Sequence, residues 1–368
     1  MIKRILMALA VAALLMSSTF VFAEEAASTE GSSVSVGGLI KMTLFDRPVS
    51  TVRNAGAQTS IEKSYGIGFK ELSLFLAIKI NDWVSFEVDP KFSASSGATP
   101  KFGVTKTVTS GSEFSFSGFG HGKAAMILKL PYDINLEVGQ IYPKFTAEYG
   151  HELFWDESIN GGIFALNSLV GSFHDSGIEI SKIFEISEVS FPVYAYILNG
   201  GTATGAYDIN NQPGAMIHVE PVWKGLTLLG SIYSMKTDAK ELKATTGWAT
   251  GLMYSWENLS IRTEFVRTKQ ERYVNGKDSN TEGYYVKLMY KVLPWFKLYA
   301  MHESAYSNFT SSTNATPTRA LGVTPGFDIY LADSTSLQFQ CDVQNWTNST
   351  GTSTLIVTRP TLAVRSIF

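Results

Sequence analysis

The chain has only one cysteine, Cys341, among its 368 residues. A single thiol excludes a disulfide framework within the chain and a cysteine-based metal cluster. Charged residues are also scarce, at 17%, whereas 45% of the residues are hydrophobic and 12% aromatic, a composition too apolar for a disordered chain. The formal net charge of −3 provides no basic footprint for a nucleic acid, so none is expected as a partner.

Long hydrophobic runs are missing except near the N-terminus. Lys3 and Arg4 precede an apolar run over 5–16, and this arrangement predicts a secretory signal peptide over 1–23. The alternative is a membrane anchor, but the run is shorter than the roughly 20 residues that a spanning helix needs. Residues 24–33 are small and polar and predict a flexible N-terminal segment. The chain is therefore expected to be exported without helical membrane spans.

What the sequence does contain is alternation of apolar and polar residues, from about residue 34 to the end. A period of two residues indicates β-strands. Near 285–292, for example, Val286 and Leu288 alternate with Lys287 and Lys291. The sixteen candidate strands lie near 34–46, 65–80, 83–93, 115–130, 133–142, 173–184, 187–198, 213–223, 226–237, 244–257, 258–270, 282–293, 296–304, 318–331, 334–346 and 354–368.

The connections between these strands alternate between short and long. The short ones are Asn81-Asp82, Pro131-Tyr132, Glu185-Ile186, Lys224-Gly225, Glu257-Asn258, Pro294-Trp295 and Asp333, and the long ones lie near 47–64, 94–114, 143–172, 199–212, 238–243, 271–281, 305–317 and 347–353. Short periplasmic turns and longer outer loops are typical of transmembrane barrels, whereas a secreted sandwich has no reason to sort its loops by length. The pattern predicts an all-β fold, a transmembrane antiparallel β-barrel of about 16 strands over 34–368.

Tryptophans recur close to the short turns, where rings with a polar tip suit the interface of headgroups and hydrocarbon. Trp248 and Trp256 share one face of one strand, and eight residues at about 3.3 Å each span roughly 26 Å. That matches the apolar band of an outer-membrane barrel, about 25 Å tall. The alternative is a buried core pair. The predicted membrane girdle consists of Trp83, Trp223, Trp248, Trp256 and Trp295.

The chain ends in Phe368 on an amphipathic last segment, and in this it resembles bacterial outer-membrane β-barrels generally. Ser366 departs from the usual apolar residue on the Phe368 face. The resemblance implies that Phe368 is an assembly signal read by the barrel-assembly machinery. It also implies a location in the bacterial outer membrane, with its lipid and lipopolysaccharide as partners.

Two stretches narrow the resemblance. Residues 69–88 resemble the early hairpin of the phosphate-selective porin O and P family, and 138–145 with Glu148-Tyr149 resemble its strand leading into the third loop. Membership would imply a 16-stranded barrel, usually a homotrimer, with an inward-folded third loop. Phosphate selectivity is not implied, because the arginine and lysine clusters on which it depends are not found in the sequence.

The polar faces of the strands are expected to line a water-filled lumen, because charges facing lipid are costly. This predicted lumen wall includes Glu87, Asp89, Lys91, Arg262, Glu264, Lys287, Lys291, Arg359 and Arg365. The third loop, 143–172, is the longest and rich in apolar residues, which favours packing inside the lumen over a solvated outer loop. Its predicted pore-constriction residues are Lys144, Glu148, His151, Glu152, Asp156 and Glu157.

Catalytic motifs such as G-x-S-x-G, H-E-x-x-H and the phosphate-binding loop are missing. The five histidines are scattered, so neither a metal site nor a cofactor is expected. The leading hypothesis is a porin, not an enzyme, for passive diffusion of small hydrophilic solutes and ions, weakly cation-preferring or near neutral. The alternatives are a structural or adhesive barrel with a plugged lumen, a phosphate- or anion-selective porin, and a barrel enzyme built from dispersed residues.

Overall fold

The computed structural model describes residues 32–46, 49–54, 57–62, 68–95, 115–147, 175–199, 213–236, 242–272, 278–307, 318–348 and 353–367. In these ranges there is no helix with the length and hydrophobicity that crossing a bilayer requires. Strands dominate, and one short 3₁₀ turn, η1 (Pro131–Asp133), occurs between two of them.

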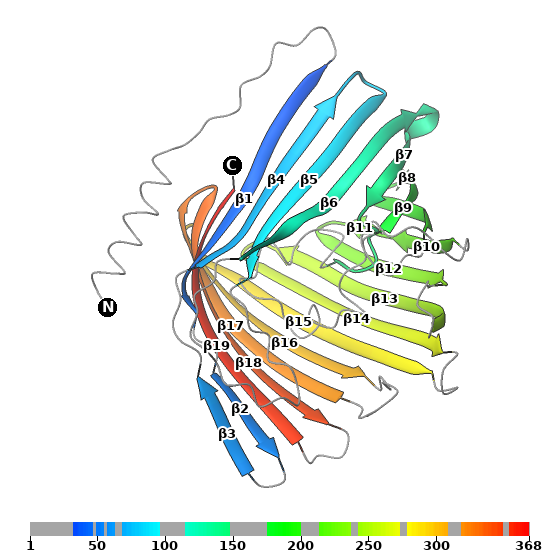
Figure 1. Cartoon of the computed structure of the whole chain (residues 1–368). Helices are drawn as coiled ribbons and strands as arrows, with labels where there is room; N and C mark the ends of the chain where they lie inside the picture. The colour runs from blue at the N-terminus through cyan, green and yellow to red at the C-terminus, as the bar shows by residue number, and fades with distance from the viewer. Residues whose placement is uncertain are drawn as a thin grey trace.

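In the described part of the chain, nineteen strand segments form one antiparallel sheet, and pairing of β1 with β19 closes it (Figure 1). The segments are β1 (Ser33–Asp46), β2 (Val49–Asn54), β3 (Ala57–Glu62), β4 (Gly68–Lys79), β5 (Val84–Ser95), β6 (Ser115–Leu130), β7 (Ile134–Ile141), β8 (Asp175–Ile186), β9 (Val189–Leu198), β10 (Gly214–Val219), β11 (Val222–Trp223), β12 (Leu226–Met235), β13 (Leu242–Trp256), β14 (Leu259–Arg272), β15 (Ser279–Leu293), β16 (Phe296–Ser307), β17 (Thr318–Ala332), β18 (Thr335–Asn348) and β19 (Ser353–Ile367).

Sixteen strands surround the barrel, because three segments continue others. β1 and β2 both pair with β19, and β4 and β3 pair with β1 and β2, so the first hairpin runs on beyond the barrel (Figure 1). β10 and β11 both lie between β9 and β12 and are separated at Pro221, which cannot donate to a ladder. The prediction of a 16-stranded antiparallel barrel is confirmed.

Two of the predicted boundaries are wrong. The supposed loop 47–64 contains β2 and β3, whose sequences VSTVRN and AQTSIE lack the apolar face that marks a membrane strand. The supposed turn Glu185-Ile186 belongs to β8, since Ile186 pairs with Val189. The chain turns instead at Ser187-Glu188, where Ser187 adopts a φ of 58° that suits a tight hairpin.

All the short turns lie at one end of the barrel, and both described chain ends lie with them. Ser33 pairs with Lys79 beside the first turn, and the Ile367 N–H donates to the Ser334 carbonyl of the last turn at 2.8 Å. An even number of strands requires this arrangement. It is also the topology of barrels whose turns face the periplasm.

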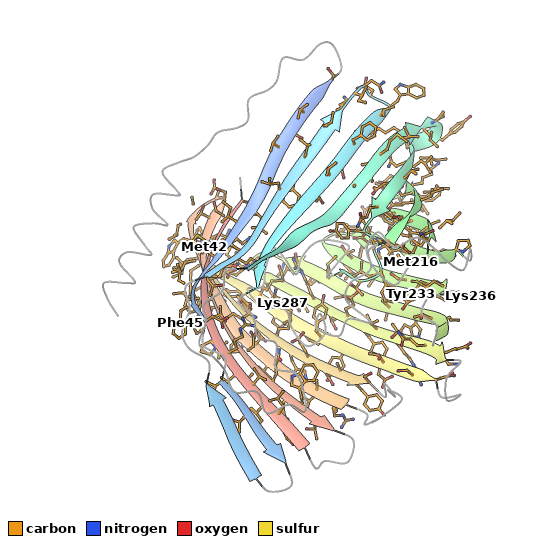
Figure 2. The ribbon with its side chains drawn as sticks, in the orientation of Figure 1. Met42, Phe45, Met216, Tyr233, Lys236 and Lys287 are labelled. Carbon is orange, nitrogen blue, oxygen red and sulfur yellow. The ribbon has the colours of Figure 1, made fainter. Side chains whose placement is uncertain are left out.

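The two faces of the sheet differ in chemistry. On β15, Leu288 is 46% exposed and points outward, whereas its neighbour Lys287 points inward and is 6% exposed (labelled in Figure 2). The outward face continues in this way around the sheet, with isoleucine, leucine, valine and tryptophan among its exposed side chains. Exposed apolar residues outside and charged residues inside are the inverse of a soluble protein, and they suit a barrel in lipid.

Candidate functional site: the inner wall and its ledge

The residues proposed as the membrane girdle all lie exposed on the outside. Trp83, Trp223, Trp256 and Trp295 lie at or next to the short turns, whereas Trp248 lies further along β13, towards the long loops. Trp248 is thus separated along the strand direction from the four tryptophans near the short turns. Their role at a membrane interface stays a prediction.

The predicted lumen-wall residues lie on several strands. Asp89, Glu264 and Lys287 are buried, Glu87, Arg262, Arg359 and Arg365 are partly buried, and Lys291 is exposed near a short turn. Lys91 pairs with Gly120 in the ladder, but its side chain lies outside the described part of the structure. Whether these residues line a conducting pore stays a prediction.

Carboxylates gather on the inner wall at β5–β8. The Lys123 ammonium lies 2.7 Å from the Glu87 carboxylate and 3.1 Å from that of Glu137. Glu137 in turn pairs across the ladder with Glu179. Among the described side chains of this sector, one lysine therefore stands with three acids, which leaves these four residues with a net negative charge.

Cations gather on the inner wall at β14–β16. Arg262 pairs across the ladder with Lys287, and Lys291 with Lys297. Like charges directly opposite each other repel, and Asp328 relieves one pair by a contact of 2.8 Å with Lys297. In the order of strands, β14–β16 lie about half the circumference away from β5–β8. The inward Glu264 and Glu303 also lie on β14 and β16, so this described sector has an excess of bases rather than bases alone, and it faces the acidic sector across the barrel.

The chain after β7 turns inward and lies on the inner wall. We call residues 142–147 the ledge. It bends tightly, with the Phe145 N–H donating to the Pro143 carbonyl at 2.8 Å. The Lys144 N–H donates to the Tyr196 hydroxyl at 3.2 Å, and the Ala147 N–H donates to the Glu264 carboxylate at 2.8 Å. The ledge thus reaches from β9 to β14 along the inside of the barrel.

Packing supports these hydrogen bonds. The Phe145 side chain is 2% exposed, and its ring meets that of Tyr233 edge to face, with centroids 4.7 Å apart. Tyr233 and Met216 (labelled in Figure 2) belong to an apolar cluster on the inner face, mainly of β9–β14. The cluster comprises Ala125, Ile141, Phe145, Tyr196, Leu198, Met216, Tyr233, Met235, Ala249, Val266, Tyr285 and Met301.

This apolar inner patch corrects the expectation that only polar side chains face inward. Segment 193–198 is apolar on both faces, and 228–235 is so apart from Ser231 and Ser234, so alternation alone could not reveal the patch. The available signal was the unbroken apolar run 193–198, which is typical of strands buried on both sides. Among the described residues of the ledge, Phe145 is the side chain that belongs to the patch.

Only one predicted constriction residue is described. Lys144 lies in the ledge, and its ammonium contacts Tyr194 at 3.0 Å from the hydroxyl and 4.2 Å from the ring centroid. Glu148, His151, Glu152, Asp156 and Glu157 lie outside the described residues, as does the predicted assembly signal Phe368.

The inner wall also carries a polar chain that sequence reasoning missed. His218 is 1% exposed, its Nδ1 lies 2.6 Å from the Ser231 hydroxyl, and its Nε2 lies 3.6 Å from the Glu220 carboxylate. Serine, histidine and an acid can form a hydrolytic triad. Here all three residues are buried in the wall beneath the ledge. The Lys144 carbonyl lies 3.3 Å from the Ser231 hydroxyl, on the side from which a substrate would have to approach the serine.

Within the described ranges, no group of three or more histidine, cysteine or acidic residues is arranged so that it could hold a metal ion. Cys341 is a free, half-buried cysteine on β18.

The barrel is similar to solved structures of bacterial outer-membrane proteins. The trimer form of OmpT of Vibrio cholerae has a TM-score of 0.61 at 13% identity, with 92% of this chain and 100% of that chain covered. An anion-selective porin from Comamonas acidovorans has a TM-score of 0.61 at 14% identity, with 92% of this chain and 100% of that chain covered. The outer membrane channel DcaP of Acinetobacter baumannii has a TM-score of 0.62 at 13% identity, with 93% of this chain and 99% of that chain covered.

No protein-family profile and no curated protein sequence matches the chain. At identities this low, the structural similarity shows the fold and not the activity. The fold is that of bacterial outer-membrane porins, and the finer resemblance to the phosphate-selective porin O and P family is not confirmed.

Proposed function

We propose that the protein is an outer-membrane porin, a water-filled channel through which small hydrophilic solutes and ions diffuse passively. The observation that carries the proposal is the ledge, which lies inside a closed barrel and is fixed to the inner wall from β9 to β14. A loop that enters the lumen narrows the passage and so sets which solutes pass.

The charge on the inner wall supports weak rather than strong ion selectivity. Acids at β5–β8 oppose bases at β14–β16, so the described wall does not carry a single sign of charge. The third loop has four acids, Glu148, Glu152, Asp156 and Glu157, against Lys144. We therefore propose a channel that is weakly cation-preferring or near neutral. Anion preference is the alternative outcome, because the porin from Comamonas acidovorans, which has the same fold, is described as anion-selective.

The environment follows from the same reasoning. We propose that the exposed apolar outer face lies in the outer membrane among lipid and lipopolysaccharide, after export by the signal peptide and assembly through Phe368. A homotrimer is proposed because a relative of the same fold has been solved in a trimer form. The buried position of Ser231, His218 and Glu220 supports a channel rather than an enzyme.

Reconstitution in a planar bilayer tests the proposal. The wild-type protein should give stepwise, ohmic conductance. Phe145→Ala should free the ledge and alter the size of the step, because the ring that covers the apolar patch is lost. Phe184→Ala is the matched control, since Phe184 is exposed near the short turns and should leave the step unchanged. Folded protein that gives no steps contradicts the proposal.

A plugged, structural barrel is the second candidate, and one observation favours it. Inward side chains on β16 and β18, including Glu303, Gln340 and Asp342, are almost completely buried. A wide aqueous lumen would leave such groups wetter. Passage of small uncharged sugars into proteoliposomes separates the two candidates, because a plugged barrel admits none of them.

A further inference from the structure

The ledge rests on a serine that has more partners than hydrogens. The Ser231 hydroxyl lies 2.6 Å from His218 Nδ1 and 3.3 Å from the Lys144 carbonyl. A serine hydroxyl donates one hydrogen and accepts through two lone pairs. The carbonyl can only accept, whereas the histidine nitrogen donates or accepts according to its protonation.

The protonation state of His218 therefore decides where the serine hydrogen goes. In a neutral imidazole with its hydrogen on Nε2, towards the Glu220 carboxylate at 3.6 Å, Nδ1 is an acceptor and takes the Ser231 hydrogen. In the imidazolium, Nδ1 is a donor, so Ser231 accepts from it and gives its own hydrogen to the Lys144 carbonyl. Protonation thus adds one hydrogen bond between the wall and the ledge.

We propose that His218 is a positioning residue for the ledge, and that its protonation fixes residues 142–147 more firmly to the inner wall. Histidine is the side chain that changes charge between about pH 5 and 8. The docking of the ledge should therefore strengthen when acidification protonates His218.

The other groups around His218 are consistent with this direction. From β9 the Tyr194 ring lies 5.6 Å away, centroid to centroid, and carries the Lys144 ammonium at 4.2 Å. From β8, Glu179 hydrogen-bonds Tyr196, which accepts the Lys144 N–H. A charged imidazole would repel the Lys144 ammonium, and the Glu220 carboxylate, 3.6 Å from His218 Nε2, offsets that charge.

Hydrogen exchange in the intact, micelle-bound protein tests the proposal without requiring conductance. The protection factors of the Lys144 and Ala147 amides, corrected for intrinsic exchange, are compared at pH 8 and pH 5. In the wild type they should rise by about fivefold on acidification, the ratio expected for one ordinary hydrogen bond. Protection that does not change with pH overturns the proposal.

Two variants should remove the pH response in opposite ways. In Ser231→Ala no hydrogen reaches the Lys144 carbonyl, so protection should stay at the low value at both pH values. In His218→Phe the serine hydrogen is always available to the carbonyl, so protection should stay at the high value. His302→Phe is the control, because His302 lies on the outer face beside Tyr284 and its loss should leave the response intact. A Ser231→Ala protein that keeps the wild-type response also overturns the proposal.

The consequence for transport rests on the proposed porin function. A firmly docked ledge should give fewer current interruptions at pH 5 than at pH 8, and Ser231→Ala should abolish this difference. If exchange responds to pH but the wild type does not conduct, the positioning role stands and the porin proposal fails. If the wild type conducts but exchange is independent of pH, the porin proposal stands and the positioning role fails.

Discussion

Asp46 and Arg359, 313 positions apart in the sequence, form a two-pronged ion pair across the seam that closes the barrel. Arg359 Nε donates to one carboxylate oxygen at 2.8 Å and Nη2 donates to the other, and the Thr361 hydroxyl adds a bond of 3.3 Å. The pair joins the end of β1 to β19. Arginine is suited to this geometry because its planar fork matches a carboxylate.

The seam pair gives the first prediction. Arg359→Lys should lower the free energy of unfolding by about 1 kcal/mol, because lysine replaces two parallel hydrogen bonds by a single point contact. The urea midpoint in micelles measures this. Asp82→Asn is the control: Lys79 lowers the pKa of the Asp82 carboxyl by a hydrogen bond, but the pair is exposed in a turn, so the midpoint should not move. Equal shifts from both changes would show that Arg359 contributes no more than an exposed charge.

The second prediction compares neighbours on β15 that face opposite ways. Leu288→Arg should destabilise the inserted barrel by about 2–4 kcal/mol, the range for a cation facing lipid near midplane. Lys287→Gln should cost less, about 1 kcal/mol, through loss of the ammonium 5.3 Å from the Tyr299 ring centroid. Folding yields into lipid vesicles give the comparison. Similar losses from the two changes would refute the assignment of faces.

The third prediction concerns a glycine beneath the ledge. A Cβ on Gly247 would lie 2.4 Å from Cε1 of Tyr233, so Gly247→Ala must displace the ring against which Phe145 packs. We expect the ledge to become cleavable by trypsin after Lys144, while the barrel stays folded. Gly230→Ala is the matched control, since its nearest neighbour would be a Val219 methyl at 3.3 Å. Resistance to trypsin in Gly247→Ala would mean that Tyr233 does not hold the ledge.

The barrel could be predicted from sequence because lipid imposes the two-residue period on every strand that it touches. The signal is lost in β2 and β3, whose sequences do not alternate between an apolar and a polar face. Inside the barrel the sequence carries no comparable constraint. The docking of Phe145 on Tyr233 joins residues 88 positions apart, and the contact of His218 with Ser231 depends on the register of β10 and β12. Neither follows from alternation, so the candidate site had to be found in three dimensions.

The last prediction concerns ion preference, and it depends on third-loop acids that lie outside the described residues. Changing Glu148, Glu152, Asp156 and Glu157 together to amides should reduce the ratio of cation to anion permeability, by a factor on the order of 5 if the local potential changes by roughly one kT.

In a narrow passage these acids would lie within about 8–10 Å of a passing ion, a Debye length at physiological salt, so the effect should shrink as salt rises. The reversal potential in a salt gradient measures the ratio. Glu188→Gln is the control, because Glu188 is paired with Lys224 at 2.7 Å in the exposed short turns and should leave the potential unchanged. A wild-type pore that strongly prefers anions, with a potential indifferent to the four changes, would place these acids outside the passage. The bases on the described inner wall, among them those of β14–β16, would then be the candidates for selecting the ion.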